Sequence, residues 1–187
     1  MKSFFITLFL SLIFFSFTSS SLAQRFQPGQ LTISPGVMVG GLGFYGGGSG
    51  LPLSVSGEYA VSDLIGVGPF VGFARYGYST GFSSYNWTFI NFGARGDLHY
   101  LRLLNELLDK EATSDKLDLY ATLMLGFQTA SFSGDAGSPL LGGFGNRATL
   151  GLAAGGRYYF TDKIAVFAEV GSLVFSALQA GVTIKLK

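Results

Sequence analysis

The sequence contains no cysteine and very little charge. The absence of cysteine among its 187 residues excludes disulfide bonds, thiolate metal sites and lipid attachment through a cysteine. Charged residues make up only 12% of the chain and the formal net charge is +1, so no broad electrostatic field favours nucleic acid or an acidic partner. The single histidine, His99, excludes a multi-histidine metal site. We therefore expect no metal, no cofactor and no nucleic-acid partner.

The N-terminal residues have the pattern of an export signal. Lys2 precedes the apolar run Phe4–Phe17, and Ser21 and Ala23 then place small residues at the −3 and −1 positions of a cleavage site. The alternative is an N-terminal membrane anchor, for which this run lies near the short end of what can span a bilayer. We expect residues 1–23 to be a cleaved signal peptide and residues 24–187 to form one exported domain.

Glycine and aromatic residues are abundant in the rest of the chain. The sequence has 28 glycines, and its 19 phenylalanines and 9 tyrosines equal them in number. Such a composition with modest hydropathy is typical of a membrane β-barrel, where only alternate residues of each strand need to be apolar.

Strict alternation of apolar and polar residues is clearest near the C-terminus. In "LQAGVTIKLK" (Leu178–Lys187) the apolar residues fall on one face, and Gln179, Thr183, Lys185 and Lys187 fall on the other. A helix would spread these polar residues around its circumference, whereas a strand collects them on one side.

The same alternation predicts eight strands, and an even number is expected for a single-chain bacterial barrel. Pro35 and Pro69 lie inside two of them and predict local irregularity, because proline cannot donate to a strand ladder. We predict an all-β fold, an eight-stranded antiparallel up-and-down transmembrane β-barrel. Its strands are expected at Gln30–Leu42, Leu53–Val61, Ile65–Tyr76, Trp87–Leu101, Leu117–Phe127, Ala148–Phe160, Ile164–Gly171 and Leu178–Lys187.

The connections alternate between long glycine-rich segments and tight turns. The long ones are Gly43–Gly50, Gly77–Asn86 and Ser133–Arg147, and short turns lie between them at Ser62-Asp63 and Thr161-Asp162-Lys163. This pattern is typical of long outer loops and short periplasmic turns, with both termini in the periplasm. The segment Leu101–Lys116 is long where a short turn is expected. We interpret it as an extended turn on the barrel rim, with a partner-docking helix as the alternative.

Several of these strands carry a family resemblance. The segments "NFGARGDLHYL", "KLDLYATLMLGF", "GGRYYFTDKIAVFAEVG" and "LQAGVTIKLK" together resemble the small outer-membrane β-barrel proteins of the OmpA/OmpX/OmpW-like, porin-family group, in the variety found in Bacteroidetes-type bacteria. The resemblance implies the outer membrane of a Gram-negative bacterium, contact with lipopolysaccharide and phospholipid, and insertion by the barrel assembly machinery.

Charged residues recur on the polar faces of the strands and would point into the lumen. An eight-stranded barrel is just wide enough for its side chains to fill it, and buried opposite charges should pair there. We expect Arg95, Arg157 and Lys185 to balance Asp97, Glu169 and Glu58 in a lumen charge network. The alternative is an ion path or gate lined by the same residues.

Two other residue sets have possible functions. His99 could belong to a Ser-His hydrolase of the kind found on barrel lipid A deacylases, but these need a serine two residues later, where this chain has Leu101. We therefore expect no enzyme. The aromatic residues near strand ends are expected to form the interfacial girdles of a membrane barrel. They are Tyr85, Trp87, Tyr100, Tyr158 and Phe160.

The sequence therefore favours an integral outer-membrane protein with a filled polar lumen and a structural or surface-interaction role through its outer loops. The alternative is a narrow passive channel for small or hydrophobic solutes. An extracellular partner is not identified by any motif.

Overall fold

The structure is a computed structural model that describes residues 26–39, 51–80, 83–101, 116–134, 146–173 and 176–187. Side chains at 78–80 and 83–85 are not described. Eight strands follow the chain. They are β1 (Leu31–Val39), β2 (Leu53–Ala60), β3 (Ile65–Thr80), β4 (Ser83–His99), β5 (Leu117–Gly134), β6 (Arg147–Tyr159), β7 (Ile164–Leu173) and β8 (Ser176–Lys185).

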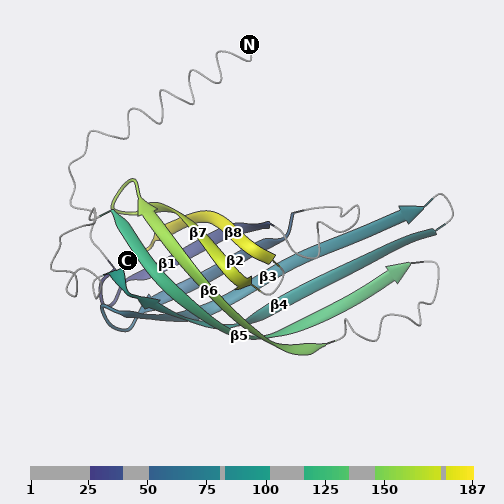
Figure 1. Ribbon diagram of the computed structural model, residues 1–187, viewed down its shortest axis with the longest axis horizontal. Coiled ribbons are helices and arrows are strands. Elements are labelled where there is room, and N and C mark those ends of the chain that lie inside the picture. Colours follow the sequence, from purple (N-terminus) through teal and green to yellow (C-terminus); the bar gives the residue numbers. More distant parts are fainter. Residues whose placement is uncertain (1–25, 40–50, 81–82, 102–115, 135–145, 174–175) are drawn as a thin grey trace, which may run out of the picture.

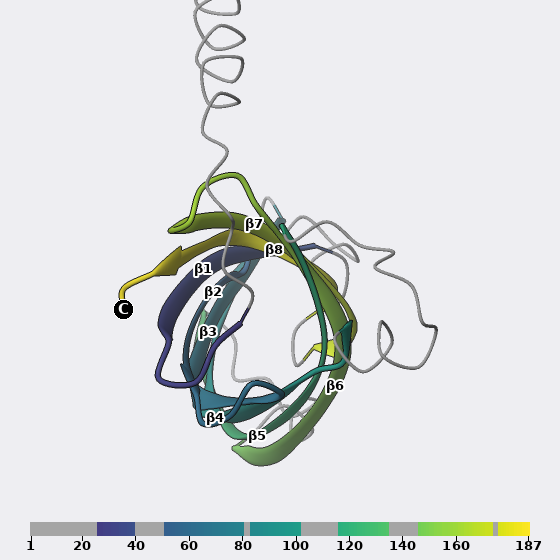
Figure 2. The same cartoon turned by 90° about the vertical axis from the view of Figure 1, so that its left-hand side faces the viewer.

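The strands close into one barrel in which each pairs with its sequence neighbours. All neighbours are antiparallel, and β8 returns to β1 with Thr32 opposite Lys185 and Val39 opposite Leu178. The closed ring is visible along the barrel axis (Figure 2). Closure gives the backbone polar groups partners without a free edge. The predicted fold class, an eight-stranded antiparallel up-and-down barrel, is confirmed.

The two prolines interrupt the ladder on one side without shifting the register. Pro35 pairs with Val55 of β2, while the pairing of β1 with β8 is broken between Ile33 and Gly36. Pro69 pairs with Ala94 of β4, while the pairing of β3 with β2 is broken beside it. The expected irregularity is therefore local. A register shift occurs elsewhere, between Val170 and Leu173 of β7.

Three strands are longer than the sequence predicts. Glycine, serine and asparagine in residues 77–86 suggested a long loop, but β3 and β4 remain paired as far as Thr80 and Ser83. Likewise β5 continues to Gly134, which pairs with Tyr85. The expected long loop at Gly77–Asn86 was therefore wrong. In Figure 1, β3, β4 and β5 project beyond the ends of the other strands.

The barrel wall is apolar outside and polar inside. Along β7 the burial alternates at every residue from Ile164 to Val170, with apolar side chains exposed and Glu169 buried. The exposed apolar side chains form a band around the barrel. They include Leu31, Val55, Val67, Val71, Phe73, Ile90, Phe92, Leu98, Leu123, Leu125, Leu150, Leu152, Val166, Val170, Val182 and Ile184.

Close approach of β4 and β5 requires glycine at position 93. A Cβ atom built there would collide with the backbone oxygen of Leu125, whereas one built at Gly96 would meet nothing within 4 Å. We predict that Gly93→Ala lowers the free energy of unfolding by about 1–3 kcal/mol, because the strands must move apart. Reversible urea unfolding in detergent micelles measures this change.

The matched control is Gly96→Ala on the same strand. It should stay within about 0.5 kcal/mol of the parent protein, as expected for a substitution that meets open space. Equal effects of the two substitutions would contradict the proposed close approach.

Candidate functional site

Strand alternation directs seven ionisable side chains into the lumen at neighbouring levels. They come from β2, β4, β5, β6 and β7, and each is at most 6% exposed. Charges buried to this extent require partners, since an uncompensated charge in the interior is strongly destabilising. The seven are Glu58, Arg95, Asp97, His99, Asp118, Arg157 and Glu169.

Arg95 is the centre of the first cluster. Its Nη2 donates to Asp97 Oδ1 and to Glu169 Oε1, both at 2.8 Å, and its Nε donates to Asp97 Oδ2 at 3.0 Å. Thr122 completes the cluster by donating to Asp97 Oδ1 at 2.6 Å. A bidentate guanidinium–carboxylate pair is among the stronger protein hydrogen-bonding arrangements. The cluster therefore joins β4, β5 and β7 across the lumen.

Arg157 is the centre of the second cluster. Its Nη1 lies 2.6 Å from Glu58 Oε2 and 3.8 Å from Asp118 Oδ2. Its guanidinium carbon is also 4.4 Å from the centroid of the Tyr120 ring, within cation–π range. The ion pair connects β6 with β2, which lie across the lumen from each other.

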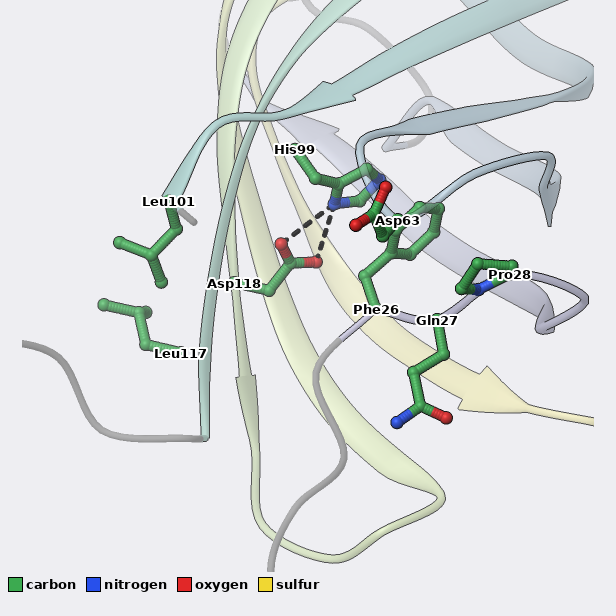
Figure 3. Close-up of a pocket in the computed structure, with 8 residues that line it drawn as sticks. All are labelled: Phe26, Gln27, Pro28, Asp63, His99, Leu101, Leu117 and Asp118. Atoms are coloured by element: carbon green, nitrogen blue, oxygen red, sulfur yellow. Dashed lines mark hydrogen bonds and ion pairs between the residues drawn. The ribbon is translucent and has the colours of Figure 1, made fainter. Parts of the chain in front are cut away.

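His99 is bound between two carboxylates at the edge of the second cluster. Its Nε2 is 2.7 Å from Glu58 Oε1, and its Nδ1 is 2.9 Å from Asp118 Oδ1. Phe26 stacks on the imidazole with the ring centroids 3.5 Å apart. Figure 3 shows Phe26 covering His99 from the open end of the barrel, with Asp118 beside the ring.

Tyr120 links the two clusters. It is fully buried, and its hydroxyl donates to Glu169 Oε1 at 2.8 Å while its ring lies against Arg157. The ring occupies the space over Gly155 of β6, where a Cβ atom would lie 2.6 Å from Tyr120 Cζ. The charged residues therefore form one continuous network that crosses the lumen.

An apolar cluster occupies the lumen on the other side of Arg95. Met38, Ala74 and Phe89 are buried there, with Tyr76, Trp87 and Ala130 packed against them. Between this cluster and Arg95 lies a cavity of about 30 Å³. That volume corresponds to about one water molecule. Charged and apolar layers together fill this part of the barrel.

The predicted lumen residues occupy two different places. Glu58, Arg95, Asp97, Arg157 and Glu169 are brought together in the network. Lys185 lies closer to the rim, half-buried, with its Nζ 5.3 Å from the centroid of the Tyr159 ring. That Lys185 balances Glu58, Asp97 or Glu169 stays a prediction.

The network also includes polar-face residues that were not among the six expected to balance one another. Asp118 and His99 supply the second carboxylate and the imidazole of the Arg157 cluster, and Tyr120 and Thr122 supply hydroxyl groups. All four belong to the polar face of an alternating strand. The alternation gives their direction, but not the level at which they meet charges from other strands.

The expected interfacial aromatics are placed unevenly. Tyr158 and Phe160 are exposed on the outer wall, with their rings 5.2 Å apart, and Tyr100 is half-buried at the end of β4. Trp87 instead points inward, like Phe89, and packs in the lumen. The prediction that it belongs to an outer girdle was therefore wrong. Tyr85 belongs to the residues whose side chains are not described.

The described residues contain neither a metal-binding cluster nor a long apolar helix. No group of three or more histidine, cysteine, aspartate or glutamate side chains within them has the arrangement of a metal site. Over the same residues there is no helix with the length and hydropathy needed to cross a membrane. The segment 102–115, expected to extend along the rim, and the signal segment 1–23 lie outside the described residues.

Removal of the Arg157 side chain tests the paired network. We predict that Arg157→Ala destabilises the barrel by about 3–5 kcal/mol, because Glu58 is left buried without its cation. Urea titration in micelles, followed by the loss of β-sheet circular dichroism, measures the change. Lys163→Ala in an exposed turn is the control, and an unchanged midpoint for Arg157→Ala would contradict a paired network at this position.

Tyr120 allows the hydroxyl and the ring to be tested separately. We predict that Tyr120→Phe costs about 1–3 kcal/mol, since Glu169 loses one buried hydrogen bond. Tyr120→Ala should cost about 3–5 kcal/mol, because it also leaves a cavity over Gly155. The same unfolding measurement applies, with Tyr158→Phe on the outer wall as the control. Equal losses for the two Tyr120 variants would argue against a role for the ring.

Comparisons with known proteins give similarities of low sequence identity. No known protein family and no curated protein matches the sequence. Among solved structures, the attachment invasion locus protein Ail of Yersinia pestis has 16% identity and a TM-score of 0.45, over 85% of this chain and 96% of that one. Neisserial surface protein A has 17% identity and a TM-score of 0.48, over 84% of this chain and 97% of that one. The outer membrane protein OprG of Pseudomonas aeruginosa has 11% identity and a TM-score of 0.44, over 88% of this chain and 98% of that one. The barrel fold follows from the strand pairing itself.

Proposed function

We propose that this protein is an integral outer-membrane β-barrel of a Gram-negative bacterium, with a filled lumen and a structural or surface-interaction role through its outer loops. The apolar exterior supports the membrane location. On β5 the outward apolar residues extend from Leu117 to Phe127, and Thr129 follows on the same face. About ten residues at ~3.4 Å each, tilted by ~40°, give a height of about 26 Å, close to the ~25 Å apolar band of outer-membrane barrels.

The observation that carries the filled lumen is the charge network. Arg95 and Arg157 are 4% and 2% exposed, and their ion pairs reach carboxylates on β2, β4 and β7. An ion that crossed this level would have to displace guanidinium groups from buried carboxylates, which is energetically costly. This supports a plugged barrel in preference to a passive channel.

The two ends of the barrel differ in a way that supports periplasmic termini. The first described residues and the last strand meet at one end, where Leu31 N donates to the backbone oxygen of Lys187 at 3.1 Å. The short β2–β3 and β6–β7 turns lie at this end (Figure 1). The other end bears the projecting halves of β3, β4 and β5. Short turns on the periplasmic side and longer structures outside are usual for such barrels.

The projecting part of β3, β4 and β5 supports a role in surface interaction. Its inward face has aromatic residues at one level, where Tyr76 is opposite Trp87 and Trp87 is opposite Phe132. The Trp87 and Phe132 rings lie 4.8 Å apart. This three-stranded ribbon extends past the apolar band, so its aromatic inner face lies beyond the proposed membrane level.

We propose a role without catalysis. Both ring nitrogens of His99 are engaged by carboxylates, so neither is available to activate a nucleophile. Leu101, where a deacylase of this architecture would need serine, is buried. The partners that fit the exterior are outer-membrane phospholipid and lipopolysaccharide, and the barrel assembly machinery during insertion.

Conductance tests the filled lumen directly. We predict that the refolded mature protein gives no discrete current steps in a planar bilayer, because the network blocks the lumen. Folding is checked on the same sample by its gel shift on heating. Reproducible steps from folded protein would overturn the plugged barrel and favour a narrow channel.

The matched variant removes one ion pair. Glu58→Ala combined with Arg157→Ala empties the level between β2 and β6 while leaving Asp118 and Glu169 in place. It should remain silent, because the Arg95 cluster and the apolar cluster around Phe89 still fill the lumen. Current steps from this variant would show that the Arg157 ion pair alone closes the barrel. The same double variant should fold, as judged by its gel shift.

A further inference from the structure

The cavity of about 30 Å³ between Arg95 and the apolar cluster borders three residues at one level of the barrel wall. Strand pairing places Asn91 of β4 beside Gly72 of β3, and Gly72 beside Ser54 of β2. Neighbouring strands lie ~4.8 Å apart, so the Cα atoms of Asn91 and Ser54 are separated by about 10 Å. Because the middle residue is glycine, there is a gap between two polar side chains.

Two other glycines at this level are covered by an aromatic ring. Gly36 of β1 pairs with Ser54, and Gly181 of β8 pairs with Gly36. A Cβ atom at Gly36 would lie 2.9 Å from Phe167 Cζ, and one at Gly181 would lie 2.7 Å from Phe167 Cε1. The Phe167 ring therefore occupies the space over both glycines. Gly72 instead borders the cavity.

Two buried oxygen atoms of the cavity lining have no hydrogen-bond partner among the described residues. They are Ser54 Oγ and Asn91 Oδ1. Asn91 Nδ2 donates to Thr149 Oγ1 at 3.0 Å, so its amide orientation leaves Oδ1 as an acceptor. A buried polar atom without a hydrogen bond is destabilising, and such atoms in proteins usually bind an ordered water.

Arg95 provides a donor on the side of the cavity that faces the charge network. It lines the cavity, and its Nη1 donates to Ser56 Oγ at 3.3 Å. Each terminal guanidinium nitrogen carries two N–H groups, so Nη1 can donate a second hydrogen bond. The lining thus offers an acceptor at Asn91, a donor at Arg95 and a hydroxyl at Ser54 that can do either. These groups suit an occupant that both donates and accepts.

The charges around the cavity oppose an ion. Among the described residues that line it there is no acidic side chain, so a cation would face Arg95 without a counterion. An anion would meet a guanidinium that already binds Asp97 and Glu169. A neutral occupant avoids both costs. A single water fits, since a buried water needs about two to four polar partners and a cavity of at least ~15 Å³.

We propose that this cavity binds one structural water molecule. The water donates to Asn91 Oδ1, accepts from Arg95 Nη1 and shares a hydrogen bond with Ser54 Oγ. It joins the charge network to the layer beside the apolar cluster, and it is a fixed part of the plug and not part of a water-filled path. The site rests on the proposed filled lumen and adds a specific ligand to it.

Oxygen-17 magnetic relaxation dispersion of the refolded mature protein in micelles tests the site. The method counts water molecules that stay inside a protein for longer than the protein takes to tumble. Gly72→Ala adds a methyl group at the wall of the cavity, between Ser54 and Asn91. We expect this variant to lose one long-lived water relative to the parent protein. Equal counts for the two folded proteins would overturn the site.

Gly96→Ala is the matched control. It makes the same substitution in β4 at a position where a Cβ atom meets nothing within 4 Å, and Gly96 does not line the cavity. The count of long-lived waters should stay that of the parent. If Gly96→Ala also removed a water, the loss would not belong to the cavity and the site would be overturned.

A second measurement uses only the parent protein. We expect a nuclear Overhauser effect between water and the side-chain amide protons of Asn91, with the sign of a long-lived contact. Its absence from folded protein would overturn the site. The Asn91 amide signals should be the same with chloride or sulfate as the buffer anion. A chloride-specific shift would indicate a bound anion and overturn the water.

The conductance measurement separates this inference from the filled lumen on which it rests. Current steps from a parent protein that retains the long-lived water would overturn the filled lumen alone. A silent, folded barrel without that water would overturn only the water site.

Discussion

Two buried guanidinium groups determine what the rest of this barrel must provide. Arg95 and Arg157 lie in a lumen closed by backbone hydrogen bonds, where neither can reach bulk water. Their carboxylate partners come from β2, β4, β5 and β7, so the registers of several strand pairs must agree at one level. A slip of one residue in any of these strands would turn a charge toward the apolar outer face of the barrel. The ion pairs and the register are therefore consistent only in this closed arrangement.

Tyr120 explains how two ion clusters become a single layer. Its hydroxyl reaches Glu169 of the Arg95 cluster, and its ring contacts the guanidinium of Arg157. The ring has room only because β6 has glycine at the facing position, Gly155. The Tyr120 ring of β5 thus fills the lumen space that Gly155 of β6 leaves open. This accounts for part of the high content of both glycine and tyrosine.

The sequence predicted well which side chains point into the lumen. It predicted poorly the height along the barrel axis at which side chains of different strands meet. Alternation on β7 predicted that Glu169 points inward, because each residue of an alternating strand points either into the lumen or away from it. It could not identify Asp118 as a neighbour of Arg157, since that depends on the β5–β6 register. Loop-like composition concealed the last four residues of β3 and the first four of β4, where ladder pairing outweighs the weak strand propensity of glycine and serine. Trp87 was misplaced for the same reason, because it was assigned to a loop boundary when it lies within a strand.

The filled centre restricts where this molecule can interact with others. Movement of a solute through the lumen would require Arg95 or Arg157 to leave its carboxylates, and Arg157 would also have to leave the ring of Tyr120. The apolar cluster around Phe89 adds a second obstruction beyond a cavity of about 30 Å³. The interior is therefore packed at both of these levels. The proposed surface role therefore places recognition at the ends of the barrel, as on the projecting ribbon of β3, β4 and β5.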